Sequence, residues 1–331
     1  MPNPYISGTG FFLPPRIVTN DELSSYMDTT DEWIQERTGI KERRYVEKGV
    51  GPSDLAIPAT EQALKAAGLT VSDIDFIIFA TSTPDFYAPG SGCVLQEKMG
   101  FNEIGALDIR VQCSGFIYGL SIAEQYIRTG NFKNILLIGA EVQSTAMNLT
   151  DEGRDTAIIF GDGSGAAIIS ATEENKGILS THMHSEGKYL KELWLEAPAS
   201  NAGHPRITRE VLDEGKQYLK MNGKEVFRHA ITRFPEVINE ALEANNLTSE
   251  NIDLLIPHQA NLRITQMVQK RLSLRNEQVF SNIHKYGNTT AATIPIALAE
   301  AFNEGKIKDG DLLVLAAFGA GFTWASAIMK W

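Results

Sequence analysis

Residues 63–81 read ALKAAGLTVSDIDFIIFAT, and a related stretch, ALEANNLTSENIDLLIPHQ, follows at residues 241–259. The two stretches align without a gap when position 63 is placed on position 241. The identical positions are Ala63, Leu64, Ala66, Leu69, Thr70, Ile74, Asp75 and Ile78, which recur as Ala241, Leu242, Ala244, Leu247, Thr248, Ile252, Asp253 and Ile256. A chance likeness between amphipathic helices would not extend through the loop and strand in one register. The repeat therefore predicts a fold built from two copies of one α/β unit.

The rest of the chain alternates short β-rich runs with longer helical patterns. The apolar runs at 134–141 and 311–318 are typical of buried strands, and the pattern at 114–130 predicts a helix. This alternation favours an α/β architecture with parallel strands. Each half also carries a Phe-Gly-x-Gly segment before an apolar strand, at 160–163 and 318–321. These segments add a second repeated feature to the predicted duplication.

The domain organisation follows from the repeat, because no linker composition separates the copies. We expect an N-terminal half at residues 1–172, which carries Cys113, and a C-terminal half at residues 173–331. The region 187–223 is polar and rich in loop-forming residues. We expect it to join the two copies over the surface and to contribute to binding.

Composition restricts the class of protein. The chain has 331 residues, of which 43% are hydrophobic, and its formal net charge is −11. This acidic balance argues against general nucleic-acid binding. No apolar run is long enough for a membrane span, and the N-terminus has no signal-peptide pattern. With only Cys93 and Cys113, a reducing cytoplasmic location is expected, and Cys93 is expected to lie in the core.

Three residues are candidates for catalysis. Cys113 stands in VQCSGFIYGL (111–120), before an apolar helical pattern, where the first helical turn can stabilise a thiolate. His258 is expected at the carboxyl end of a strand, where α/β sheets place catalytic groups. Asn288 is expected to project from a polar turn before a helix.

A cysteine, a histidine and an asparagine fit two kinds of site. In a hydrolase, the histidine deprotonates the cysteine and the asparagine orients the histidine. In a carbon–carbon condensing enzyme, the histidine and asparagine donate hydrogen bonds to a thioester carbonyl. The spacing of the three residues does not decide between these sites.

Six blocks of sequence point to one family. They are DTTDEWIQERTGIKERR (28–44), VQCSGF (111–116), GDGSGAA (161–167), PHQANLRI (257–264), YGNTTAATIP (286–295) and FGAGFTW (318–324). Together they resemble the β-ketoacyl-acyl-carrier-protein synthase III family, and they occur in that family's order across nearly the whole chain. The resemblance implies a thiolase-like fold, in which two duplicated α/β halves form five layers, αβαβα.

The resemblance also implies an activity. An enzyme of this kind condenses an acyl-CoA primer with malonyl-acyl carrier protein, with loss of CO₂, and so initiates fatty-acid synthesis. Cys113 would hold the acyl group, His258 and Asn288 would assist decarboxylation, and the backbone N–H groups of Cys113 and Ala320 would form the oxyanion hole. No cofactor is implied, since acyl-CoA is a substrate. The expected partners are acyl carrier protein and a second copy of the chain.

Further positions match the family's binding residues. Those expected to contact CoA and its pantetheine arm are Trp33, Arg37, Arg154, Gly223, Phe227, Ala260 and Asn261. Those expected to dock the acidic carrier protein are Arg228, Arg263, Lys270 and Arg271. The last three of these fall on one face of a predicted helix.

The chain also departs from the family pattern. Gln112 precedes the nucleophile where many relatives have alanine, and Ala320 replaces a glycine. Ala88 stands where acetyl-preferring relatives carry a phenylalanine that closes the acyl pocket from the partner subunit. We therefore expect a primer longer than acetyl. His182 and His184 alternate on a predicted strand, but no third ligand accompanies them, so no metal site is predicted.

Two other functions remain open at this stage. One is a related condensing enzyme of secondary metabolism that uses a longer acyl primer. The other is a Cys-His-Asn acyl-CoA thioesterase, which would release a free acid without malonyl.

Overall fold

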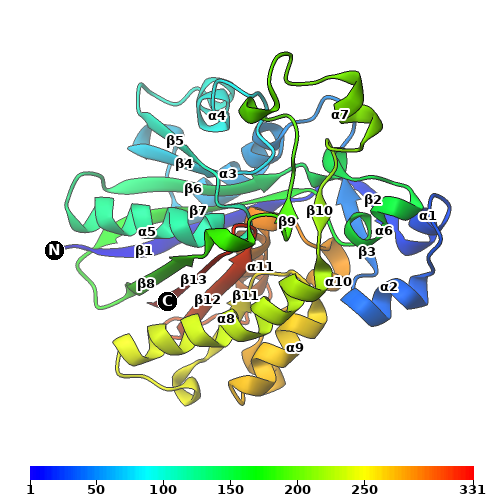
Figure 1. The fold of residues 1–331 in the computed structure, drawn as a ribbon. Helices are drawn as coiled ribbons and strands as arrows, with labels where there is room; N and C mark the ends of the chain where they lie inside the picture. Colours follow the sequence, from blue (N-terminus) through cyan, green and yellow to red (C-terminus); the bar gives the residue numbers. More distant parts are fainter.

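The computed structural model describes residues 1–331 and contains two large sheets with helices between and outside them (Figure 1). In spatial order, the first sheet contains β1 (Asn3–Phe12), β7 (Gly163–Thr172), β6 (Asn134–Glu141), β4 (Phe76–Ala80) and β5 (Gly105–Ile109). The second sheet contains β11 (Leu254–Pro257), β12 (Leu312–Gly319), β13 (Thr323–Lys330) and β8 (Gly177–Ser185). The predicted strand at 134–141 therefore has the bounds of β6.

The sheets are mixed, which corrects the expectation of parallel strands. Strand β4 is parallel to β5 and β6, and β11 is parallel to β12, but the remaining pairs are antiparallel. The reason is visible at β12 and β13, which follow one another through the short turn at residues 320–322. Such a turn can connect only antiparallel neighbours, whereas parallel strands need a long crossover.

The duplication predicted from the sequence extends through the catalytic region in the register that places position 63 on position 241. In this register β4 begins at the position of the first residue of β11, and β6 covers the same positions as β12. The first residue of α5 (Gly115–Arg128) likewise corresponds to the first residue of α11 (Thr293–Asn303). A 3₁₀ turn precedes each of these two helices, and the first residue of each turn has a positive φ: 44° at Gln112 and 51° at Thr290.

The helices form three layers around the two sheets, which gives the five-layered arrangement (Figure 1). Helix α3 (Pro52–Ala67) packs on the outer face of the first sheet, and α8 (Gly223–Ala244) packs on the outer face of the second. The central layer contains α5 and α11, which contact strands of both sheets. One apolar cluster includes side chains from both sheets and both central helices, so the two halves share a core.

The region 187–223 does not join the two halves, contrary to expectation. The connection between the sheets is the short segment 173–176, because β8 before residue 187 already belongs to the second sheet. Residues 187–223 instead connect β8 to α8 and contain β9 (Leu193–Trp194), α7 (Arg209–Asp213) and β10 (Lys220–Met221). The strand predicted around His182 and His184 is β8, but its residues alternate weakly and are largely accessible, so the sequence did not indicate that it belongs to the second sheet.

The N-terminal half has an insertion at the equivalent place, between β1 and α3. It contains β2 (Arg16–Thr19), α1 (Asn20–Ser24), α2 (Asp31–Thr38) and β3 (Glu42–Tyr45). The remaining helices are α4 (Ser91–Met99), α6 (Arg154–Ala157), α9 (Leu262–Arg271) and α10 (Ile283–Tyr286). Both insertions contribute residues to a cavity of about 570 Å³.

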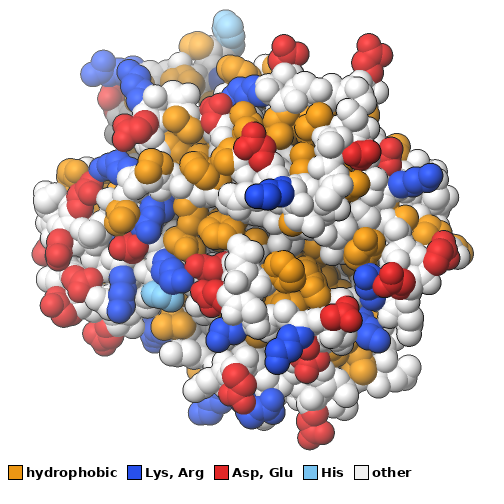
Figure 2. All heavy atoms as spheres, turned by 180° about the vertical axis from the view of Figure 1, so that it is seen from behind, with side chains coloured by type: hydrophobic (Ala, Val, Ile, Leu, Met, Phe, Trp, Pro, Cys, Tyr) orange, Lys and Arg blue, Asp and Glu red, His pale blue; other side chains and the backbone are white.

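The surface carries acidic and basic side chains interspersed with apolar atoms, as the view from behind shows (Figure 2). None of the helices is both long and apolar enough to cross a membrane. Cys93 is exposed on α4 and does not lie in the core as expected. The reason is that α4 buries Ser91, Gly92 and Leu95, which places Cys93 on the opposite side.

Candidate active site

The thiol of Cys113 lies inside the protein at the start of α5. The residue is 5% exposed, and it belongs to the 3₁₀ turn that leads into the helix. Burial raises the pKa of Cys113 to about 12, and the carboxylate of Glu141 adds to the increase. The backbone N–H groups of Cys113 and Ala320 lie close to the sulfur and act in the opposite direction on its pKa. A negative charge at this sulfur therefore has donors in place.

Those two N–H groups are the ones expected to form the oxyanion hole. Ala320 follows β12 and does not adopt a positive φ, so alanine is compatible with this turn. Its neighbour Gly319 must be small, because a Cβ there would lie 2.6 Å from the Cβ of Cys113. Glycine thus lets the backbone after β12 approach the cysteine closely.

His258 directly follows β11 and is 2% exposed. Burial lowers its pKa to about 3, so the imidazole is neutral near pH 7. The Nδ1 atom lies 2.6 Å from the hydroxyl oxygen of Thr293, the first residue of α11. The ring has no other hydrogen-bond partner within the protein, which leaves Nε2 free for a substrate.

Asn288 is held by its backbone and by one side of its amide. Its N–H donates to the carbonyl of Ile159 at 2.9 Å, and its carbonyl accepts from Gly161 at 3.1 Å. Its side-chain Oδ1 accepts from the N–H of Thr290 at 2.8 Å. Because Oδ1 is occupied, the Nδ2 group is the part of the amide that remains available as a donor.

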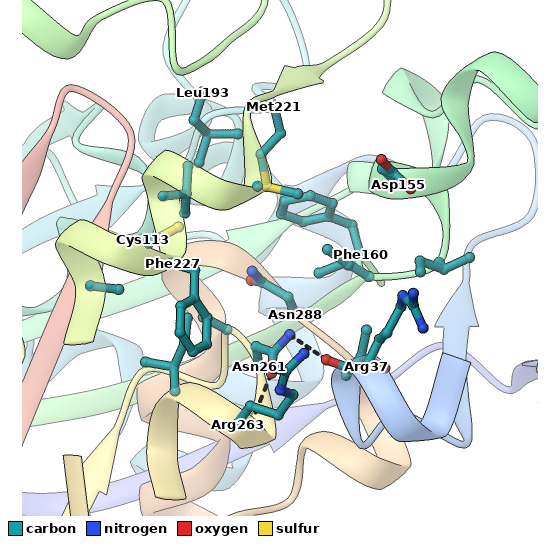
Figure 3. Close-up of a pocket in the computed structure, with 18 of the residues that line it drawn as sticks. Arg37, Cys113, Asp155, Phe160, Leu193, Met221, Phe227, Asn261, Arg263 and Asn288 are labelled. Carbon is teal, nitrogen blue, oxygen red and sulfur yellow. Dashed lines mark hydrogen bonds between the residues drawn. The ribbon is translucent and has the colours of Figure 1, made fainter. Parts of the chain in front are cut away.

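A cavity of about 570 Å³ is lined by all three residues. Figure 3 shows Cys113 and Asn288 among the residues of this lining. Cys113, His258 and Asn288 line its inner part, and the insertions of both halves line its outer part. All residues expected to contact CoA lie along it: Trp33, Arg37, Arg154, Gly223, Phe227, Ala260 and Asn261. Its volume is in the ordinary range of ligand pockets.

The outer part of this cavity is aromatic and basic. The guanidinium groups of Arg37 and Arg154 lie 4.2 and 4.8 Å from the centre of the Trp33 ring. Asn261 donates to the backbone carbonyl of Arg37 at 2.9 Å and so connects α9 to α2 (Figure 3). An indole ring with two guanidinium groups close to it is suited to an adenine ring with phosphates beside it.

The residues expected to dock the carrier protein have different positions. Arg263 lines the cavity, and its guanidinium lies 5.5 Å from the centre of the Phe227 ring. Lys270 and Arg271 are exposed at the end of α9, outside the cavity. Arg228 is also exposed and forms an ion pair with Glu225.

A second cavity, of about 420 Å³, reaches Cys113 from another side. Its apolar lining includes Tyr87, Leu190, Leu193, Trp194, Leu195 and Leu219. Gln112, Thr290 and Ala320 line it close to the cysteine. Ala88, the position expected at the acyl pocket, lines neither cavity of its own chain and is exposed in the loop before α4.

Three residues of the site were not expected from the sequence. Glu141 is fully buried at the end of β6, and burial raises its pKa to about 7. Thr293 contacts His258, and Lys224 lines the larger cavity. The duplication could have pointed to Glu141, since it aligns with Gly319 in the register of the repeat. No sequence signal distinguished Thr293 or Lys224.

Comparison with known protein families gives a consistent result. The family profile described as "3-Oxoacyl-[acyl-carrier-protein (ACP)] synthase III" matches residues 107–187, and the profile of its C-terminal part matches residues 242–331. Two curated relatives are named β-ketoacyl-[acyl-carrier-protein] synthase III. The protein of Caldanaerobacter subterraneus subsp. tengcongensis is 46% identical over 98% of this chain and 97% of its own. That of Clostridioides difficile is 46% identical over 98% of both chains.

Solved structures agree with this result. The 3-oxoacyl-[acyl-carrier-protein] synthase III of Aquifex aeolicus VF5 superposes with a TM-score of 0.90 at 41% identity, covering 99% of this chain and 100% of that one. The priming β-ketosynthase of the R1128 polyketide pathway has a TM-score of 0.91 at 29% identity, covering 99% and 96%. With nearly half of its residues identical to those of such relatives along almost its whole length, and with the same duplicated fold, this chain belongs to the β-ketoacyl-acyl-carrier-protein synthase III family.

Proposed function

We propose that this enzyme condenses an acyl-CoA primer longer than acetyl with malonyl-acyl carrier protein. The observation that carries this proposal is the position of Cys113 where two cavities meet. The larger cavity supplies an aromatic and basic opening for CoA or for the carrier's pantetheine arm. The smaller cavity supplies apolar space for the acyl chain.

The first half-reaction transfers the acyl group to Cys113. The sulfur of Cys113 forms a bond to the thioester carbon, the bond to the CoA sulfur breaks, and the thiol proton ends on the departing CoA. The N–H groups of Cys113 and Ala320, which lie near the sulfur, would stabilise the oxyanion of the tetrahedral intermediate. Trp33, Arg37 and Arg154 would hold the nucleotide meanwhile.

The second half-reaction forms the carbon–carbon bond. The malonyl carboxylate leaves as CO₂, and its electron pair gives an enolate whose oxygen needs hydrogen-bond donors. His258 and the Asn288 amide would supply them from the inner end of the cavity. The enolate carbon then attacks the acyl carbon on Cys113, the carbon–sulfur bond breaks, and a proton from water restores the thiol. The reaction as written consumes no cofactor.

The size of the smaller cavity supports a longer primer. A volume of about 420 Å³ is several times what an acetyl group needs, since one water molecule takes about 30 Å³ in the liquid. Each methylene buried there would contribute about 0.8 kcal/mol to binding. The apolar side chains from residues 190–195 suit an alkyl chain.

The carrier protein and a second copy of the chain are the proposed partners. Arg228, Lys270 and Arg271 are exposed cations on α8 and α9, the helices that also carry Phe227 and Arg263 of the larger cavity, and they are suited to an acidic carrier. A homodimer is supported by β5, which is an edge strand, and by Phe86 and Tyr87, which are 57% and 68% exposed. Dimer formation would bring Ala88 of one subunit toward the other; analytical ultracentrifugation tests it.

The deciding experiment is intact mass after brief exposure to acetyl-, butyryl-, octanoyl- and dodecanoyl-CoA, with Cys113→Ser as the control, followed by malonyl-acyl carrier protein. We expect an adduct that needs Cys113, forms fastest with a chain longer than acetyl, and disappears as a β-ketoacyl product. Hydrolysis of the adduct to a free acid in the absence of malonyl would instead indicate the thioesterase. Fastest loading by acetyl-CoA would refute the longer primer.

A further inference from the structure

The smaller cavity has polar side chains in its wall as well as apolar ones. Three of them, Ser82, Thr83 and Gln143, donate to the same carboxylate oxygen of Glu141, at 2.8, 2.8 and 3.2 Å. The amide of Gln143 also donates to the hydroxyl of Ser82 at 2.9 Å. These donors are therefore used inside the protein and are not available to a ligand in the cavity.

Two further polar side chains of this wall, Arg110 and Gln112, are not used in this way. Neither has a hydrogen-bond or ion-pair partner within the protein, and Arg110 is exposed. The nearest acid along the chain, Asp108, is directed elsewhere, because its carboxylate accepts from the N–H groups of Ser91 and Gly92 at 2.5 and 2.8 Å. In a chain of net charge −11, a cation that lines a cavity without a counter-charge is suited to binding an anion.

We propose that the primer is an acyl-CoA with a carboxylate at the far end of its acyl chain, the thioester of a dicarboxylic acid, and that Arg110 and Gln112 bind this carboxylate. A guanidinium group presents parallel N–H donors that match the two oxygens of a carboxylate, and a glutamine amide supplies another donor. This inference rests on the proposed function, because it names the class of primer that Cys113 accepts. The far carboxylate takes no part in the bonds made and broken at the thioester.

The positions of the two residues in the chain limit the length of the primer. Three peptide units separate Arg110 from Cys113, so their Cα atoms are at most about 11 Å apart. Gln112 is the neighbour of Cys113 and belongs to the same 3₁₀ turn. A carboxylate bound by them is within reach of a short or medium acyl chain, whose methylenes would pack on apolar side chains such as Leu193 and Trp194. Pairing with the cation offsets the loss of hydration that a carboxylate suffers in an apolar cavity.

The test compares acyl-CoA primers of equal carbon number on the full chain. Succinyl-CoA is paired with butyryl-CoA, adipoyl-CoA with hexanoyl-CoA, and suberoyl-CoA with octanoyl-CoA, and intact mass gives the rate of Cys113 acylation at limiting thioester. We expect the dicarboxylic member of at least one pair to load about tenfold faster, the effect of one charge-assisted contact. If no dicarboxylic member loads faster than its monocarboxylic partner, the proposal is wrong.

Variants assign the effect to the two side chains. We expect the ratio of dicarboxylic to monocarboxylic loading to fall about tenfold in Arg110→Met and to fall also in Gln112→Ala, whereas Arg110→Lys should keep part of it. Arg209→Met, at an exposed arginine that lines neither cavity, is the control and should keep the wild-type ratio. An unchanged ratio in Arg110→Met, or an equal decline with both primers, would overturn the proposal and would fit an arginine that contacts a second copy of the chain instead.

The same measurements separate this inference from the proposed function. If monocarboxylic primers load Cys113 and give a β-ketoacyl product with malonyl-acyl carrier protein as fast as dicarboxylic primers do, the proposed function stands and only the carboxylate site is refuted. If no acyl-CoA loads Cys113, the proposed function itself fails, and this inference fails with it.

Discussion

At the scale of single residues, the 3₁₀ turn before each central helix has a different role in the two halves. Cys113 and Ala291 occupy equivalent positions of the repeat, in the two 3₁₀ turns before the central helices. At Cys113 the N–H group lies beside the thiol, whereas at Ala291 the N–H group lowers the pKa of the Glu141 carboxyl. One copy of the turn therefore directs an N–H group at the candidate nucleophile, and the other directs one at a carboxyl group of the protein itself.

The charge on Glu141 should slow the reaction of the thiol. This carboxylate raises the pKa of Cys113, so Glu141→Gln should lower that pKa and speed alkylation by iodoacetamide at pH 8. Because the pKa of Glu141 is about 7, the difference should shrink toward pH 6, where the wild-type carboxyl is largely protonated. Glu240→Gln, a change at an accessible carboxylate, is the control. Equal alkylation rates in all three proteins at pH 8 would contradict this prediction.

His258 should make the fold sensitive to acid. Its pKa is lowered to about 3, so between pH 3 and its unfolded value near 6.5 the unfolded chain binds more protons, and stability falls as the pH decreases. From pH 6.5 to pH 5 the loss from this group is about 2 kcal/mol. In His258→Asn, the free energy of unfolding from urea titrations should decline less over this interval. The same slope in both proteins would show that His258 is not buried neutral.

At the scale of elements, the hairpin of β12 and β13 positions the N–H group of Ala320, which is part of the proposed oxyanion hole. The strands pair without a shift from Leu312 with Lys330 to Gly319 with Thr323, and the turn between them contains Ala320. The hydroxyl of Thr323 lies 3.2 Å from the carbonyl of Ala320 and 3.1 Å from the hydroxyl of Ser114. The hairpin end is thereby tied to the turn that carries the nucleophile.

A side chain at Gly319 should separate these two turns. In Gly319→Ala, the new Cβ would lie 2.6 Å from the Cβ and 3.0 Å from the sulfur of Cys113. We expect acylation to be nearly abolished and the fold to lose about 1–3 kcal/mol, as is usual for overpacking. Gly187→Ala is the matched control, since no atom lies within 4 Å of its added Cβ. Wild-type acylation in Gly319→Ala, measured by intact mass, would be incompatible with this geometry.

At the scale of the whole molecule, the two halves share their largest apolar cluster. It combines Ile78 and Leu137 of the first sheet with Ile256 and Leu315 of the second, together with residues of α5 and α11. We propose that residues 1–172 and 173–331 are two copies of one unit that do not unfold separately. The shared central layer supplies the physical reason, because exposing it would cost both halves their burial.

Removing one side chain from this layer should therefore destabilise the whole chain. Ile256→Ala should cost about 2–5 kcal/mol and lower the midpoint of a single calorimetric transition. Leu190→Ala, which changes a side chain that is 53% exposed, should shift the midpoint little. Two resolved transitions in Ile256→Ala, of which only one is shifted, would show that the halves unfold independently.

Exposed charge at the end of α9 should affect binding of the carrier protein selectively. The double change Lys270→Glu with Arg271→Glu reverses two exposed cations on α9, and we expect a higher KM for malonyl-acyl carrier protein. Acylation by acyl-CoA should be unchanged, because neither residue lines either of the two cavities. Lys306→Glu with Lys308→Glu, beyond the C-terminal end of α11, is the charge-matched control. An equal rise in KM in the control would indicate a net-charge effect only.

The sequence by itself determined the duplication, the main buried strands and the three candidate catalytic residues. These features depend on local apolar periodicity and on six blocks of sequence, and both can be read directly from the order of residues along the chain. The sequence could not establish strand direction or the role of residues 187–223, because both depend on how β7, β8 and β13 pair in space. Only the tertiary structure revealed that Thr293 contacts His258 and that Gly319 makes room for Cys113. Contacts between residues far apart in the chain produce no periodic pattern in the sequence, so they are determined only by how the elements pack in the folded protein.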